Sequence, residues 1–252
     1  MERFIASPNL PVGKVTSVIM GSRFPQIAGA LRGAGVKVLE LPVNKDIPAP
    51  VSAHADMSAY YCGDGELIVS GSIFRTAHLE GLTLRRAESI QTDKYPLDVS
   101  LNACETGHFI ICRRESTDKM ILDHAEKRGK TVISIRQGYA KCSVCVLDEK
   151  HIITADSGIA AAVREHGMDA LLIEPGFFRL PGYEYGFIGG SCFKIAGNTI
   201  AFTGSLSGHP NEKEILKYIN NANIDVVYLT KEPCIDVGSI LPITEDIEFT
   251  ER

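Results

Sequence analysis

Apolar residues along this chain fall into short runs that recur at regular intervals. Four of these runs follow a short segment that has Ser in its fifth place, after a few strand-forming residues and a polar turn, and the four serines lie 42, 43 and 48 residues apart. The four segments are 54–58, 96–100, 139–143 and 187–191, and a weaker fifth copy starts near Asn9. Fixed periods of this length indicate one supersecondary unit copied along or around a core.

Each copy predicts the same order of elements: strand, turn, strand, helix, strand. We place the first strand on the Ser-containing segment and the second on the apolar run that follows. A helix then shows apolar residues at helical spacing and ends at a glycine. The second strands are expected at 66–69, 108–111, 151–154 and 199–202, with 17–20 in the weaker copy. The helices are expected at 23–32, from an N-cap at Ser116, Thr117 or Asp118 to Gly129, from an N-cap at Asp156 or Ser157 to Gly167, and from near Pro210 onwards. The third strands are expected at 36–41, 131–135, 170–173 and 225–229.

The second copy is the least regular. Residues 72–86 are compatible with a helix, although Gly81 and Thr83 weaken it, and 89–95 reads as a loop. The acidic tail after Cys234 either runs over the surface or closes the repeat on itself.

Five copies that close on themselves form a five-bladed α/β propeller, which we predict as a single domain over residues 1–252. Equivalent positions would then converge on one axis. If the Ser-containing segments are strands, their third and fifth residues share a face, because side chains alternate along a strand. Polar side chains that are buried there need partners, either one another or a ligand. The candidate ligand-binding residues are Asn9, Ser58, Asp98, Lys141 and Ser191.

The composition narrows the class of protein. The 252 residues are 44% hydrophobic and 23% charged, which is typical of a soluble globular protein. The net charge is −5 without a basic stripe, so nucleic acid is not an expected partner. We expect neither a membrane span nor a secretory signal. Seven cysteines without a disulfide-like spacing favour reduced thiols in the cytoplasm. The oligomeric state is left open.

Two motifs add a resemblance to the repeat pattern. His54-Ala55-Asp56 and Gly189-Gly190-Ser191-Cys192, within a fivefold α/β repeat, resemble the guanidino-group-modifying enzymes of the pentein superfamily. This superfamily includes arginine and agmatine deiminases, amidinotransferases and dimethylarginine hydrolases, together with a ribosome anti-association factor that is not an enzyme. The resemblance runs from about Asn9 to Leu229 and looks like a divergent branch of the superfamily.

The resemblance implies a cofactor-free hydrolase or transferase that acts on a small guanidine- or amidine-like compound at the ring centre. Cys192 would be the nucleophile and His54 the acid and base, while Asp56 and Asp98 would hold the cation. Lys141, which would repel a cation, and the uncertain direction of Cys192 favour an alternative. In that alternative the chain is a non-catalytic pentein that binds a small ligand or a partner protein.

Three further segments carry open alternatives. Cys142 and Cys145 have the spacing of metal or redox pairs, but a structural zinc site needs four ligands, and strand residues three apart face opposite ways. We therefore expect no metal there. Residues 175–183 form a lid, a partner surface or a rigid loop, and residues 204–210 form an anion site or a flexible loop.

Overall fold

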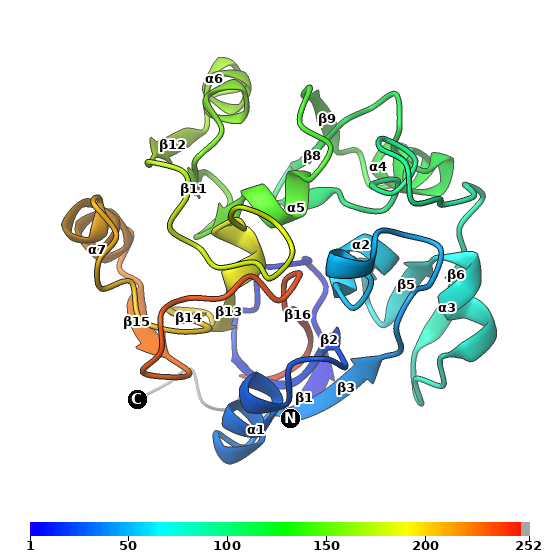
Figure 1. The fold of residues 1–252 in the computed structure, drawn as a ribbon, viewed down its shortest axis with the longest axis horizontal. Coiled ribbons are helices and arrows are strands. Elements are labelled where there is room, and N and C mark those ends of the chain that lie inside the picture. The colour runs from blue at the N-terminus through cyan, green and yellow to red at the C-terminus, as the bar shows by residue number, and fades with distance from the viewer. Residues whose placement is uncertain (248–252) are drawn as a thin grey trace.

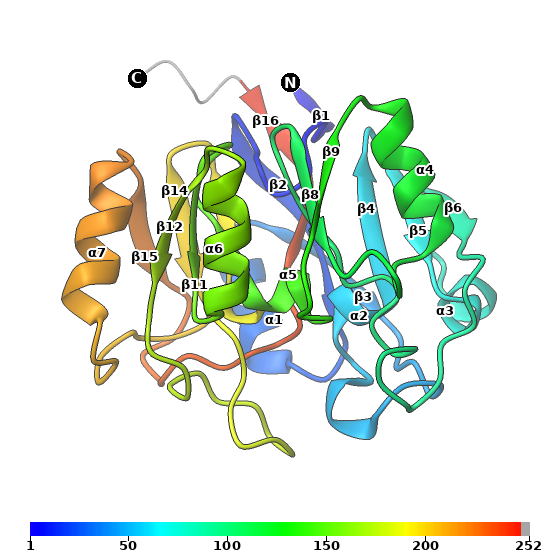
Figure 2. The ribbon, with the colours of Figure 1, turned by 90° about the horizontal axis from the view of Figure 1, so that it is seen from above.

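The computed structural model describes residues 1–247 as a mixed α/β fold made of small units that follow one another around the molecule (Figure 1). The helices α1, α3, α4, α6 and α7 lie on the outside of the view in Figure 1. The short helices α2 and α5 and the strands β2, β13 and β16 lie nearer the middle. The view from above in Figure 2 shows α4, α6 and α7 standing beside the strands of their own units.

Four units share one topology, in which the first and second strands are antiparallel and the second and third are parallel. The helix of each unit lies between its second and third strands in the chain. The units are β4 (Ala59–Gly63), β5 (Glu66–Val69), α3 (Gly71–Thr76) and β6 (Thr83–Arg86); β7 (Cys104–Thr106), β8 (Phe109–Cys112), α4 (Lys119–Lys127) and β9 (Thr131–Ser134); β10 (Cys145–Val146), β11 (His151–Thr154), α6 (Ser157–Glu165) and β12 (Asp169–Leu172); and β13 (Cys192–Ala196), β14 (Thr199–Phe202), α7 (Glu212–Asn221) and β15 (Asp225–Tyr228).

The remaining unit takes its first strand from the C-terminal part of the chain. β16 (Leu241–Asp246) runs antiparallel to β2 (Lys14–Gly21), and β2 pairs in parallel with β3 (Lys37–Leu41) after α1 (Pro25–Gly33). β1 (Glu2–Phe4) adds to the free side of β16, and one bridge between Ala196 and Lys14 joins β2 to β13. The tail after Cys234 therefore pairs with the start of the chain and does not run over the surface.

The predicted second strands, third strands and outer helices are confirmed, with ends shifted by a few residues. Asp118 and Asp156 cap α4 and α6 by accepting hydrogen bonds from the backbone N–H groups of Met120 and Ile159. In the irregular second copy, the helix that 72–86 could form covers only the first part of that range, because it ends at Thr76 and Thr83 starts a strand that pairs with β5.

The Ser-containing segments are not strands, which corrects the prediction. They form the short helices α2 (Ala55–Ser58) and α5 (Ala140–Ser143), a turn over 96–100, and the 3-10 helix η2 (Gly189–Ser191); η1 (Ala49–Val51) is a further 3-10 turn. The first N–H groups of a helix have no partner within it. Asn102 supplies one to α5, because its Oδ1 accepts from the N–H groups of Lys141 at 2.7 Å and Cys142 at 3.4 Å.

The serines therefore do not gather in one layer. Ser58 Oγ accepts from Asn44 Nδ2 at 3.2 Å, and Ser191 Oγ donates to the carbonyl of Phe187 at 2.9 Å. Ser58, Ser100 and Ser191 each have local hydrogen-bond partners, whereas Ser143 Oγ is buried without one within residues 1–247.

Apolar residues from neighbouring units fill the space between them. One cluster joins Ile68 of β5 to Ile110 of β8 and Ile121 of α4, and all three side chains are buried. Burial of each such side chain contributes about 1.5–3 kcal/mol, so the contacts between units fix the position of the centre. Within residues 1–247, none of the helices has the length and apolar character needed to cross a bilayer.

Candidate active site

A cavity of about 200 Å³ opens at the centre, where several units meet. Its wall comes from the segment before α2, from α5, from the loop that leads to η2, and from the segment before β16. The residues that line it are Val51, His54, Tyr139, Cys142, Leu180, Tyr183, Glu184, Tyr185, Phe187 and Asp236. The cavity thus combines aromatic side chains with an imidazole, a thiol and two carboxylates.

His54 is buried in the cavity wall with unused hydrogen-bonding capacity. It is 1% exposed, and neither ring nitrogen has a hydrogen-bond partner within residues 1–247. Nδ1 lies 3.8 Å from Oδ1 of Asp236. Burial lowers the pKa of His54 to about 4, although the charge of Asp56 acts in the opposite direction. The imidazole is therefore neutral near pH 7, and its ring nitrogens are available to a ligand.

Gly238 makes room for His54. Its φ is +72°, which favours glycine, and a Cβ there would lie 2.1 Å from the Cβ of His54. The turn before β16 therefore fixes the imidazole through direct backbone contact.

The thiol of Cys142 in α5 contacts the carboxylate of Asp56 in α2. Its Sγ donates to Oδ2 of Asp56 at 3.0 Å and accepts from Nδ2 of Asn102 at 3.2 Å. One donor atom from each of His54, Asp56 and Cys142 lies within 4.8 Å of the other two. Burial raises the pKa of Cys142 well above its usual range, and the charges of Asp56 and Asp236 act in the same direction. The site therefore holds a protonated thiol beside a neutral imidazole.

Ser239 joins Asp56 to Lys141. Its hydroxyl donates to Oδ2 of Asp56 at 2.6 Å, and Nζ of Lys141 donates to it at 3.3 Å. Ser239 has a φ of +63°, which is uncommon for a residue with a side chain and is found most often at functional positions. Asp56 and Lys141 therefore meet through a strained serine that the repeat pattern did not single out.

Asp236 is the second buried carboxylate of the centre. Its oxygens accept from the N–H groups of Phe187 and Gly238, both at 2.9 Å, and burial raises its pKa to about 6. A Cβ on Gly190 would lie 1.9 Å from Oδ1 of Asp236. The glycine pair that drew attention to Cys192 thus provides space for this carboxylate.

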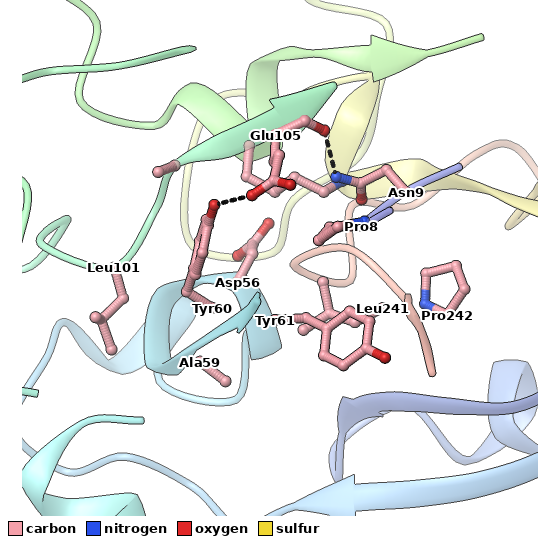
Figure 3. Close-up of a pocket in the computed structure, with 12 residues that line it drawn as sticks. Pro8, Asn9, Asp56, Ala59, Tyr60, Tyr61, Leu101, Glu105, Leu241 and Pro242 are labelled. Atoms are coloured by element: carbon pink, nitrogen blue, oxygen red, sulfur yellow. Dashed lines mark hydrogen bonds between the residues drawn. The ribbon is translucent and has the colours of Figure 1, made fainter. Parts of the chain in front are cut away.

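A second, smaller pocket is lined by Asp56 and Lys141 among other residues, and Figure 3 shows it from close by. Its volume is about 20 Å³, room for about one water molecule. Figure 3 shows Glu105 between Tyr60 and Asn9: the Tyr60 hydroxyl donates to its carboxylate, and Nδ2 of Asn9 donates to its carbonyl at 2.9 Å. The structure thus places Asn9 near Asp56 but outside the larger cavity.

Two other predicted residues stand behind the cavity wall. Oδ2 of Asp98 accepts a hydrogen bond from the Tyr139 hydroxyl at 2.9 Å, and the Ser191 hydroxyl donates to the carbonyl of Phe187 at 2.9 Å. Both contacts support aromatic residues that line the cavity. Asp98 and Ser191 therefore shape the site through Tyr139 and Phe187.

Cys192 starts β13 inside an apolar cluster that includes Ile153 and Phe202. Its thiol interacts with that of Cys145, both cysteines being free, and Cys192 is not among the residues that line the cavity. The nucleophilic role that the resemblance gave it stays a prediction. Cys142 was passed over because residues three apart were treated as members of one strand, whereas Cys142 lies in α5 and Cys145 in β10.

Solved structures similar to this chain include two amidinotransferases and an agmatine deiminase. An inosamine-phosphate amidinotransferase from Streptomyces griseus has a TM-score of 0.56 at 10% identity, with 96% of this chain and 97% of that chain covered. An amidinotransferase of saxitoxin biosynthesis from Microseira wollei has a TM-score of 0.51 at 12% identity, covering 93% and 92%. A C. jejuni agmatine deiminase with substrate bound has a TM-score of 0.51 at 12% identity, covering 91% of each chain.

These structures belong to the pentein superfamily, so the predicted resemblance is confirmed; at such low identity it shows the fold alone. No curated protein matches the sequence. One family model matches residues 19–241, which is most of the chain, and its description is a family of unknown function, DUF6873. With that match, the chain belongs to the DUF6873 family.

Proposed function

We propose that this protein is an enzyme that breaks or transfers a carbon–nitrogen bond of a small guanidine- or amidine-like cation. The observation that carries the proposal is the juxtaposition of a neutral, unpartnered His54 and the Cys142 thiol at the wall of one cavity, beside two buried carboxylates. The names of the structural neighbours support the reaction class. We also propose that the five units are the blades of a five-bladed propeller with this cavity on its axis.

The charges of the site favour a monocation. When Asp56 and Asp236 are both ionised, they face one ammonium, that of Lys141, which leaves one negative charge buried. A buried charge without compensation is costly, and a guanidinium would provide the missing positive charge. A guanidinium also has N–H donors in a planar arrangement that suits carboxylate oxygens.

The chemistry then requires only residues of the centre. Sγ of Cys142 attacks the central carbon of the substrate while its proton passes to His54. His54 returns that proton to the departing amine as the carbon–nitrogen bond breaks. In the hydrolase case, a water molecule that gives its proton to His54 attacks the same carbon, the carbon–sulfur bond breaks, and the thiol is restored. A transferase would use an acceptor amine in place of water.

The lining indicates what the rest of the substrate looks like. Tyr139 and Phe187 are stacked with their centroids 6.1 Å apart, and Tyr185 meets Phe187 edge-on at 6.3 Å. Within residues 1–247, the charged side chains that line the cavity are Glu184 and Asp236, which are both acidic, while His54 is neutral. A substrate with an apolar or aromatic body and no carboxylate fits this lining better than an amino acid does.

The test is ammonia release, or amidino transfer to added amines, from a panel of guanidines with matched cysteine variants. Cys142→Ala should lower the rate by about 10³-fold or more, since the nucleophile is lost. Cys192→Ala is the control, as it removes a thiol from the apolar cluster and should leave most of the rate. The opposite ranking would assign the nucleophile to Cys192. Binding of guanidines without turnover by the wild type would favour the non-catalytic alternative.

A further inference from the structure

We propose that His54, Asp56 and Cys142 also form a binding site for a soft divalent metal ion of the zinc class. The three residues offer nitrogen, oxygen and sulfur donors that all lie within 4.8 Å of one another. Imidazole, carboxylate and thiolate are the ligands that zinc takes in proteins. The geometry alone carries this site, and only its effect on activity rests on the function proposed above.

The unpartnered atoms of these residues point to a missing ligand. Nδ1 and Nε2 of His54 and Oδ1 of Asp56 are buried without a hydrogen bond in the described part of the chain. Buried polar atoms without a partner are rare, because each loses its hydration without compensation. A metal ion bound by one nitrogen of His54 and by Oδ1 of Asp56 would use two of these three atoms.

Small side-chain movements bring the three donors within reach of one ion. Zinc lies about 2.0 Å from nitrogen and oxygen ligands and about 2.3 Å from sulfur, so two ligands of a tetrahedral site are about 3.3–3.5 Å apart. The donors lie within 4.8 Å of one another, and side-chain shifts that shorten the longest separation by about 1–1.5 Å complete the site. On binding, the proton that Cys142 shares with Oδ2 of Asp56 leaves for solvent, and a sulfur–metal bond forms in its place.

The surroundings hold the ligands in place. Nδ2 of Asn102 donates to Sγ of Cys142 at 3.2 Å, and the Ser239 hydroxyl donates to Oδ2 of Asp56 at 2.6 Å, which leaves Oδ1 for the metal. Such outer contacts fix the orientation of metal ligands.

The charge also balances. A thiolate and the two carboxylates of Asp56 and Asp236 face the single ammonium of Lys141, and a dication neutralises the remaining two negative charges. Since His54 and Cys142 line the cavity, a fourth coordination position faces the cavity space.

The metal and the proposed substrate would exclude each other. Metal-bound Cys142 has no free electron pair aimed at a substrate carbon, and a dication beside Asp56 repels a guanidinium. Zinc-class ions would therefore inhibit the proposed reaction, and the inhibition would be relieved by a chelator.

The experiment is titration of the metal-free, reduced full-length protein with Co²⁺, read by visible absorption, with no substrate present. We expect one equivalent to bind in a tetrahedral, thiolate-containing site. Cys142→Ser should remove the sulfur-to-cobalt band, and Asp56→Asn, which keeps the shape of the side chain, should weaken binding at least about 10-fold. Cys192→Ser should bind as the wild type does.

The inference is overturned if the folded wild type binds no Co²⁺, or if Asp56→Asn and Cys142→Ser bind it unchanged. Metal binding by a protein that turns over no guanidine would leave this inference standing and remove the proposed function. Turnover by a protein that binds no metal would do the reverse.

Discussion

The thiol of Cys142 donates to Oδ2 of Asp56 across 3.0 Å, although 86 positions separate the two residues in the chain. Ser239, from the segment that precedes β16, reaches the same oxygen at 2.6 Å. Cys142 and Ser239, which are far apart in the chain, thus donate to the same carboxylate oxygen of Asp56. The proposed chemistry depends on this arrangement.

The contact between Gly238 and His54 predicts a strong effect of Gly238→Ala. The new Cβ would lie 2.1 Å from the Cβ of His54, at a φ of +72°, so both the backbone and the imidazole must shift. We expect a loss of at least about 2–3 kcal/mol in the free energy of unfolding and a large loss of turnover. Urea denaturation and the ammonia assay provide the two readouts.

Gly35→Ala is the matched control for this variant. Gly35 has a φ of +82° but open space around a Cβ, so only the backbone penalty of about 1 kcal/mol applies, with activity unchanged. Equal losses from the two variants would show that the contact with His54 has no role.

Ser239 offers a pair of substitutions that separates hydrogen bonding from backbone strain. Ser239→Ala removes the hydroxyl that joins Lys141 to Asp56, and we expect a destabilisation of about 1–3 kcal/mol. Ser239→Gly removes the same hydroxyl but relieves the φ of +63°, and should recover about 1 kcal/mol. If the glycine variant is no more stable than the alanine variant in urea denaturation, the strained backbone carries no cost.

Glu105 predicts how stability changes with pH. Burial by itself would raise the pKa of Glu105, but hydrogen bonds from His124 and Tyr60 and the charge of Lys130 together lower it below the ordinary 4.5. A lowered folded-state pKa means that the unfolded state binds the proton more readily. The contribution of ionised Glu105 to the free energy of unfolding is therefore complete above pH 4.5. It disappears as the pH falls through the lowered pKa of the folded state.

The measurement for Glu105 is urea denaturation of wild type and Glu105→Gln from pH 7 down to pH 3. The difference in unfolding free energy between the two proteins should shrink as the pH falls. A difference that stays constant over that range would contradict the assigned pKa direction.

The acidic, aromatic lining of the cavity predicts a preference among guanidines. A carboxylate held about 4 Å from Asp236 or Glu184 would cost about 1–4 kcal/mol. We therefore expect alkyl- and arylalkylguanidines to bind at least about 5-fold more tightly than arginine. Tyrosine fluorescence reports the binding, since the chain contains no Trp. Glu184→Gln should reduce the preference, and tighter binding of arginine to the wild type would contradict this picture of the lining.

The repeat pattern predicted the outer parts of each unit well. The caps at Asp118 and Asp156 and the glycine stops are local signals, and local hydrogen bonds decide where those helices begin. Similarly, the apolar run 66–69 forms the strand that its β-branched and aliphatic residues favour.

The centre could not be predicted in the same way, because its conformation depends on distant partners. Asn102, 39 positions away in the chain, caps α5 by accepting a hydrogen bond from the N–H of Lys141. The helix within 139–143 therefore depends on this distant residue and is not indicated by the local sequence. That turn aims Cys142 at Asp56, where a strand would have aimed it differently. Asp236 and Ser239 lie outside the repeated segments, so no comparison of copies could find them.

The most direct test of the proposed mechanism is rapid quenching of the enzyme during turnover of a guanidine substrate, followed by peptide mass spectrometry. The account predicts an amidino adduct on Cys142, resolved by fragmentation from Cys145, that accumulates and decays at the rate of turnover. An adduct on Cys192, or turnover that persists in Cys142→Ala at the wild-type rate, would contradict it.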